Sequence, residues 1–210
     1  MRRFQSRRFI IYFSNFILMM FSFSQMSVFG DTCTNLPITS FIIRQQISRT
    51  AGVLISRPCP LDEKIRELLI GANINCVDEY LLWLKDSITY KKDIGGDYWA
   101  YPELTLERGW GDCEDFAFLN QAVLRVMGYE ARALSLMRLG NCHAICVFLN
   151  GNEYAIIDNC RLITTQAKSM EELAQYLLTA YQAASLCALN LDSRTQEIIF
   201  KRKQMSICKK

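Results

Sequence analysis

The sequence has very little histidine. His143 is the only one among 210 residues, and no two cysteines have C-x-x-C spacing. Zinc sites are built from several such ligands, so both absences disfavour a zinc protein. Repeats of roughly 20–50 residues and low-complexity tracts are also missing, which argues against solenoids and biased chains. Half of the residues are hydrophobic, which suffices for one core.

The first 30 residues differ from the rest. MRRFQSRRF carries four arginines, an apolar stretch follows, and Gly30 provides a small residue for cleavage. This order predicts a secretory signal peptide over residues 1–30 and a periplasmic or secreted protein. The alternative is an uncleaved membrane anchor. Against it, the stretch is shorter than the ~20 residues of a spanning helix, and Asn15 interrupts it. The residues before Cys33 lack the apolar position of a lipidation box.

Loss of that leader changes the charge balance. It removes 4 of the 24 basic residues and none of the 21 acidic ones, which leaves 20 against 21 and a net charge near −1. The apparent basicity therefore belongs to the targeting segment, and nothing in the charge indicates a nucleic-acid partner. The basic C-terminal KRKQMSICKK is expected to be a solvated tail.

The nine cysteines form an odd set. In an exported protein an even number can pair, so a free Cys113 would leave eight for disulfides. The pairing cannot be deduced from sequence. The cysteines are Cys33, Cys59, Cys76, Cys113, Cys142, Cys146, Cys160, Cys187 and Cys208.

The periodicity predicts an α+β fold, with helices first and an antiparallel sheet after them. Residues 31–60 form an irregular lead-in with one helix around 40–55, and residues 61–210 form a single domain. Helices are expected at 62–71, 77–92, 113–127 and 169–187. Strands are expected at 129–137, 143–149, 153–159 and 196–200. The glycine-rich connection between residues 93 and 111 is long, as functional loops often are.

The third of these helices places a thiol at its start. Asp112 suits the N-cap, Asp115 follows three residues later, and Gly128 suits the C′ position. Cys113 therefore lies in the first turn. There the free N–H groups and the helix dipole favour a thiolate, the nucleophilic form.

The only histidine lies in a predicted hairpin. With Asn150 and Gly151 as a two-residue type I′ turn, His143 would directly face Asp158. A carboxylate at that position can accept the imidazole N–H and fix its orientation. A Cys113–His143–Asp158 arrangement follows if the helix start packs against this part of the sheet.

Structural roles for each of these residues are also open. A cysteine at a helix start is commonly a small buried residue, and a histidine opposite an aspartate is commonly a structural pair. Their occurrence together in one short segment favours the catalytic interpretation.

The same residues resemble a known family. DYWAYPELTLERGWGDCEDFAFL, together with NCHAICVFL and AIIDN, looks like the bacterial transglutaminase-like cysteine peptidases, in particular the LapG-type periplasmic proteases. Cys113, His143 and Asp158 match the positions of the family's nucleophile, histidine and acid. The upstream element matches at Asp97, Trp99, Pro102 and Glu103. The resemblance spans about residues 77–159.

This resemblance implies a papain-like α+β core that hydrolyses a peptide bond in an exported surface protein, often an adhesin of a biofilm. It also implies restraint by an inner-membrane receptor. The chemistry requires no cofactor, but several members depend on calcium, for which Asp112, Glu114 and Asp115 are candidate ligands because Ca²⁺ prefers carboxylate oxygens. The alternative is that these acids only cap the helix.

The expected mechanism is acyl transfer to water through a Cys–His–Asp triad. The backbone N–H of Cys113 and the indole N–H of Trp99 are candidate oxyanion donors. Two alternatives are a transamidase that uses the same triad and a catalytically silent binding module of the same fold.

Overall fold

The computed structural model describes residues 60–202. The predicted signal peptide at 1–30, the lead-in as far as residue 59 and the basic tail after residue 202 lie outside these residues, whereas Lys201, predicted to belong to the solvated tail, ends strand β8 (Thr195–Lys201). None of the helices within residues 60–202 is long and apolar enough to span a membrane. The five helices in that range are α2 (Pro60–Gly71), α3 (Val77–Ser87), α4 (Pro102–Arg108), α5 (Cys113–Val126) and α6 (Met170–Ala180).

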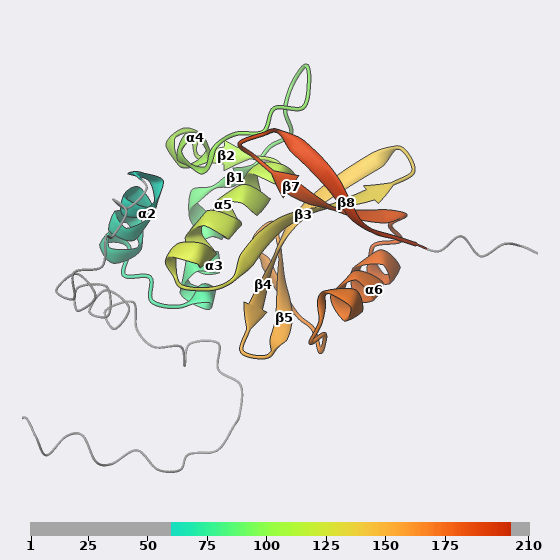
Figure 1. Ribbon diagram of the computed structural model, residues 1–210. Helices are drawn as coiled ribbons and strands as arrows, with labels where there is room; N and C mark the ends of the chain where they lie inside the picture. Colours follow the sequence, from blue (N-terminus) through green and yellow to red (C-terminus); the bar gives the residue numbers. More distant parts are fainter. Residues whose placement is uncertain (1–59, 203–210) are drawn as a thin grey trace, which may run out of the picture. The chain divides into compact units, whose positions relative to one another are not determined.

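A six-stranded antiparallel sheet forms the centre of the fold, with strand order β6-β5-β4-β3-β7-β8 (Figure 1). Its strands are β3 (Ala131–Arg138), β4 (Asn141–Asn150), β5 (Glu153–Asp158), β6 (Arg161–Thr164), β7 (Ser185–Asn190) and β8 (Thr195–Lys201). A short parallel pair, β1 (Thr89–Tyr90) and β2 (Trp110–Gly111), lies beside the helices. The predicted α+β class is confirmed by this arrangement.

Each face of the sheet is covered by helices. One core contains α5, parts of α2 and α3, and sheet residues such as Phe148 and Ile157. The other contains α6 and sheet residues such as Leu136 and Ile145. Figure 1 shows α5 and α6 on opposite sides of strands β3–β5. Because side chains alternate along a strand, β4 contributes to both cores. Its residue Ala144 belongs to a third small cluster, against which Cys113 at the start of α5 packs.

Helix α5 is close to the sequence prediction. Asp112 is its N-cap, and the Asp112 N–H donates to Asp115 Oδ2 at 3.2 Å. At the other end Gly128 has φ +95°, the left-handed conformation expected at C′. The apolar face of α5 is buried, including Phe116, Leu119 and Val123. Local capping and periodicity were therefore sufficient to position the thiol.

Other predicted bounds were wrong. Helix α3 ends at Ser87 rather than residue 92, because residues 89–90 pair with β2. Helix α6 ends at Ala180, and residues 185–190 form β7 beside β3. Helix α4 was missed, because residues 93–111 were predicted to be one long glycine-rich connection; Pro102 lies in its first turn, where proline is favourable.

The hairpin register also differs from the prediction. Asn150 pairs with Glu153, so Gly151 and Asn152 form the turn. Only Gly151 has a positive φ (+65°), which is the pattern of a type II′ turn rather than type I′. His143 is therefore not directly opposite Asp158. The shift is two residues, however, and an even shift keeps every side chain on its predicted face.

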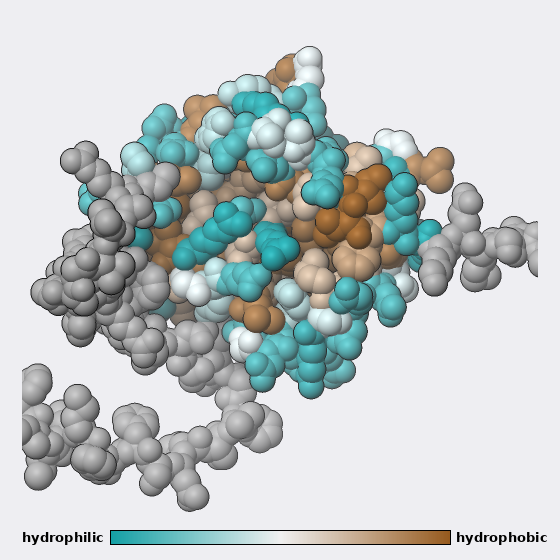
Figure 2. Space-filling view, in the orientation of Figure 1, coloured by the Kyte–Doolittle hydropathy of each residue, from teal (hydrophilic) through white to brown (hydrophobic). Residues whose placement is uncertain are grey.

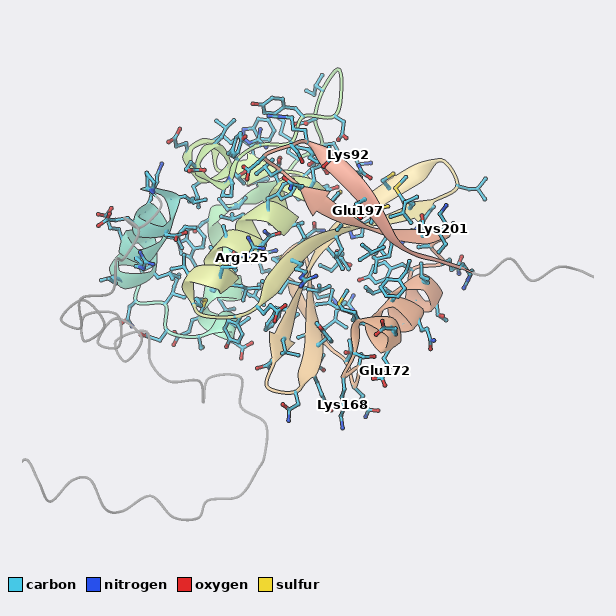
Figure 3. The ribbon with its side chains drawn as sticks, viewed as in Figure 1. Lys92, Arg125, Lys168, Glu172, Glu197 and Lys201 are labelled. Atoms are coloured by element: carbon cyan, nitrogen blue, oxygen red, sulfur yellow. The ribbon has the colours of Figure 1, made fainter. Side chains whose placement is uncertain are left out.

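Strand β8 is one edge of the sheet. Ile198 is 50% exposed on it, and Figure 2 shows an apolar area over this strand among mainly hydrophilic surroundings. Glu197 and Lys201 are labelled on the same strand in Figure 3. Charged side chains on an exposed edge discourage pairing with other chains.

Candidate active site

Cys113 is the first residue of α5, and a carboxylate network fixes the turn before it. Asp115 accepts hydrogen bonds from the Ala100 N–H at 2.7 Å and from the Arg108 guanidinium. A Cβ at Gly111 would lie 2.7 Å from the Asp115 Cβ. Only glycine at that position therefore lets Asp115 approach the chain, which explains the spacing of the GDCED motif.

The thiol is half-buried and turned towards a neighbouring acid. Its Sγ donates to Glu114 Oε2 at 3.1 Å. Burial raises the pKa of the Cys113 thiol to about 12, the Ala144 N–H opposes this by hydrogen-bonding the sulfur, and the Glu114 charge adds to the increase. Without a positive charge close by, the group is a thiol at neutral pH.

His143 and Asp158 form the predicted pair despite the register shift. His143 Nε2 lies 2.7 Å from Asp158 Oδ1. The Tyr181 hydroxyl donates to Asp158 Oδ2 at 2.8 Å, and its ring stacks on the imidazole with centroids 6.1 Å apart. Burial raises the pKa of Asp158, but the hydrogen bonds from His143 and Tyr181 outweigh it and leave the pKa below its ordinary value.

One cleft of about 550 Å³ contains all three predicted catalytic residues, Cys113, His143 and Asp158. No hydrogen bond joins the sulfur to the imidazole in the described part of the chain. Because Nε2 is occupied by Asp158, Nδ1 is the ring nitrogen left for the thiol. The structure thus brings the three residues together, and their joint catalytic action stays a prediction.

A cluster of carboxylates lies beside the thiol in the same cleft. Oxygen atoms of Asp93, Asp112 and Glu114 all lie within 4.8 Å of one another. Asp112 Oδ1 and Glu114 Oε1 are buried and have no hydrogen-bond partner among residues 60–202. Burial raises the pKa of Glu114 to about 9. Such a cluster must hold either a proton or a cation, and its donors fit a hard cation such as Ca²⁺.

The structure changes the predicted ligand set. Asp115 is not in the cluster, because its carboxylate is used by Arg108 and by backbone N–H groups. Asp93 takes its place from the loop before α4, where its Oδ2 also accepts the Tyr98 N–H at 2.6 Å. Sequence gave no sign of Asp93, since it lies about twenty residues before the motif in a glycine-rich loop.

The predicted oxyanion donor Trp99 is engaged elsewhere. Its indole N–H donates to Asp97 Oδ2 at 3.3 Å, and its ring packs on Phe118 with centroids 5.6 Å apart. Tyr90, which was not singled out, lines the cleft instead. Burial raises the pKa of Tyr90, so its hydroxyl remains a donor.

Five of the described cysteines are free: Cys113, Cys142, Cys146, Cys160 and Cys187. The possibility that Cys113 alone is free while the other eight cysteines form disulfides is therefore not what the structure shows. Cys142 is exposed and lines the cleft together with Cys113. Any thiol-labelling experiment must separate these two residues.

Sequence reasoning missed the hydrogen bond from Tyr181 to Asp158, because this contact depends on how α6 docks. Tyr181→Phe removes one hydrogen bond to a carboxylate and keeps the ring. We expect kcat/KM to fall about tenfold. In the plot of kcat/KM against pH for this variant, the acid limb should move to higher pH, because Asp158 loses a hydrogen bond that lowers its pKa.

The control for this variant is Tyr176→Phe, which alters an exposed tyrosine of α6, the helix that Tyr181 caps at its C-terminus. A purely structural role for Tyr181 would lower the melting temperature without moving the pH profile. An unchanged profile in the Tyr181→Phe protein would contradict the positioning role.

A thiol at a helix start thus shares one cleft with a His–Asp pair from an antiparallel sheet. Residues 71–159 match the family model of the transglutaminase-like superfamily. Over these residues the chain is similar to that superfamily, which confirms the predicted resemblance at the level of the superfamily. The match ends at Asn159, directly after the candidate acid.

Solved structures with a distant likeness include LapG of Legionella pneumophila. Its calcium-bound form is 16% identical, covers 78% of this chain and 91% of that chain, and has a TM-score of 0.45. Another LapG structure is 20% identical, covers 59% and 77%, and has a TM-score of 0.39. No curated protein matches the sequence significantly. Likenesses of this size do not identify a substrate.

Proposed function

We propose that the chain is an exported cysteine endopeptidase of the LapG type. The observation that carries the proposal is the shared cleft of Cys113, His143 and Asp158, with the thiol at a capped helix start. The substrate is an extended segment of a periplasmic or surface protein, adhesin-like by the family resemblance. An inhibitory receptor in the inner membrane is the partner expected on the same ground.

In the proposed reaction the Cys113 thiolate attacks the scissile carbonyl. His143 takes the thiol proton through Nδ1 and later gives it to the leaving amine. Asp158, held by Tyr181, orients the ring and stabilises its charged form. The Cys113 N–H and the Tyr90 hydroxyl are the candidate donors to the oxyanion. Water then releases the acyl group.

Calcium is the proposed cation of the carboxylate cluster. Asp93, Asp112 and Glu114 would hold it, as their mutual distances and unpartnered oxygens support. Bound Ca²⁺ would supply positive charge beside the thiol, which favours the thiolate. Asp115 would keep its structural role in the helix start.

The test compares exported and surface proteins of the producing cells with those of a Cys113→Ala strain. We expect at least one protein to be longer in the variant strain than in the wild type. The terminus of its shorter, wild-type form then gives the cleavage site. A Cys160→Ala strain is the control, because this half-buried cysteine does not line the cleft. Identical protein patterns in all strains would contradict the proposal.

A reaction of the purified protein with a substrate found in this way distinguishes a peptidase from a transamidase. Supplying a primary amine would then yield an amine adduct of the acyl product, whereas a peptidase releases a free carboxyl terminus. A silent binding module would yield neither product.

A further inference from the structure

Arg138 is a cation in the catalytic cleft whose purpose the triad does not explain. It is the last residue of β3 and pairs across the β3–β4 turn with Asn141. Both residues line the cleft together with His143 and Tyr181. Its guanidinium carbon lies 5.8 Å from the centroid of the Tyr181 ring. Arg138 therefore stands next to the aromatic residue that holds the catalytic carboxylate.

This guanidinium has no anionic partner among residues 60–202. Its Nε is buried and makes no hydrogen bond there. The nearby carboxylate of Asp158 is already used, because Oδ1 binds His143 and Oδ2 accepts the Tyr181 hydroxyl. By comparison, Arg108 is paired with Asp115 and Arg132 with Glu130. A partly buried guanidinium without a partner is a costly arrangement unless a ligand provides one.

The charges in the cleft are divided between its two sides. Three acids, Asp93, Asp112 and Glu114, cluster at the helix start and outnumber Lys92, which also lines the cleft there. Arg138 belongs instead to the β3–β4 turn, beside the His143–Asp158 pair. A negatively charged substrate group would be repelled at the helix start and attracted at the turn. The geometry of a guanidinium suits a carboxylate, which it can bind through two parallel N–H groups.

We infer that Arg138 forms a subsite that binds a carboxylate of the peptide substrate close to the scissile bond. This inference rests on the proposed peptidase function and specifies which substrates that site prefers. The carboxylate comes from an Asp or Glu side chain or from the substrate's own C-terminus. Arg138 is thus a specificity-determining residue and takes no part in the proton transfers.

The test uses a proteome-derived peptide library with amidated C-termini, cleaved by the full exported chain in the presence of Ca²⁺. Mass spectrometry of the products should show Asp and Glu enriched at one fixed position from the cleaved bond. In a matched pair of peptides that differ only at that position, the peptide with Glu should have a kcat/KM about 10- to 100-fold higher than the peptide with Gln. A second library with free C-termini tests whether Arg138 binds the C-terminal carboxylate of the substrate instead. In that case cleavage should occur at a fixed distance from the C-terminus, without a preference for internal Asp or Glu.

Two variants and a control complete the experiment. Arg138→Gln should remove the acidic preference, so that the ratio of kcat/KM for the Glu and Gln peptides falls to about one. Arg138→Lys should keep part of the preference, because lysine keeps the positive charge but cannot bind a carboxylate through two parallel N–H groups. Arg132→Gln alters an exposed arginine of the same strand and should leave the preference intact.

The outcomes separate this inference from the proposed function. Cleavage by the wild type without preference for a carboxylate in either library overturns the subsite and leaves the peptidase standing. Equal loss of cleavage on acidic and neutral peptides in Arg138→Gln, with a lower melting temperature, shows a structural role and also overturns it. If the wild type cleaves nothing in either library, the peptidase function fails and the subsite fails with it.

Discussion

Replacing His143 by alanine is expected to slow the acylation of Cys113 by about 10²–10⁴-fold, the usual contribution of a general acid–base group. The reason is geometric. Asp158 holds Nε2 at 2.7 Å, so Nδ1 is the nitrogen that can take the thiol proton. The measurement is the rate of covalent labelling by a thiol-directed acyl probe, with the modified residue identified by mass spectrometry in the presence of Ca²⁺.

Cys113→Ala should abolish this labelling altogether. Cys142→Ala is the control, since Cys142 is the other cysteine of the cleft and is exposed. Its loss should leave the rate unchanged. Equal labelling rates in the wild type and in His143→Ala would show that the imidazole does not activate the thiol, and the peptidase mechanism would be rejected.

Calcium is expected to change both thiol reactivity and stability by large amounts. In the metal-free protein the pKa of the Cys113 thiol is about 12, so alkylation should be slow at pH 7 and should accelerate as pH rises. Added Ca²⁺ should move this curve to lower pH, because positive charge beside the sulfur favours the thiolate. The measurement is the alkylation rate as a function of pH, with and without a chelator.

The stability of the metal-free protein should depend on pH with a definite sign. Burial raises the pKa of Glu114 from 4.5 to about 9, so the folded state holds a proton that the unfolded state has lost between these values. Stability should therefore fall as pH rises from about 4.5 to about 9. Calcium should cancel this fall and add about 2.7 kcal/mol at one hundred times its dissociation constant.

Thermal unfolding with and without a chelator measures this effect. Glu114→Gln should remove most of the response to calcium, whereas Asp62→Asn, an acid in the first turn of α2, should not. Melting curves and alkylation rates that are identical with chelator and with Ca²⁺ would contradict the metal proposal. The carboxylates would then serve only the helix start.

Sequence predicted the parts of the site that depend on local signals. The start of α5 was found because Asp112 caps it and an apolar period follows, and the end was found because Gly128 adopts a positive φ. The turn chemistry was less certain. Asn-Gly suggested a type I′ turn, but Gly151 is the first turn residue. The contact between His143 and Asp158 survived because the error was an even number of residues.

The residues that sequence missed are held by contacts between distant segments. Tyr181 reaches Asp158 only because α6 docks on the far face of the sheet. Asp93 joins the acids of α5 through a loop that has no periodic pattern. Trp99 was chosen as a donor from its chemistry, yet the structure gives its N–H to Asp97. Propensity and spacing do not encode such partners, so only the three-dimensional fold identifies them.

The strand order of the sheet has a consequence for when the candidate site forms during folding. β3 pairs with β7, about fifty residues later in the chain, and Tyr181 lies in the segment that leads into β7. Pairings of this sequence separation form late, since a long loop must close first. Tyr181 and β7 follow β3–β6 in the sequence, so a chain cut before this segment docks would lack the contact that holds Asp158.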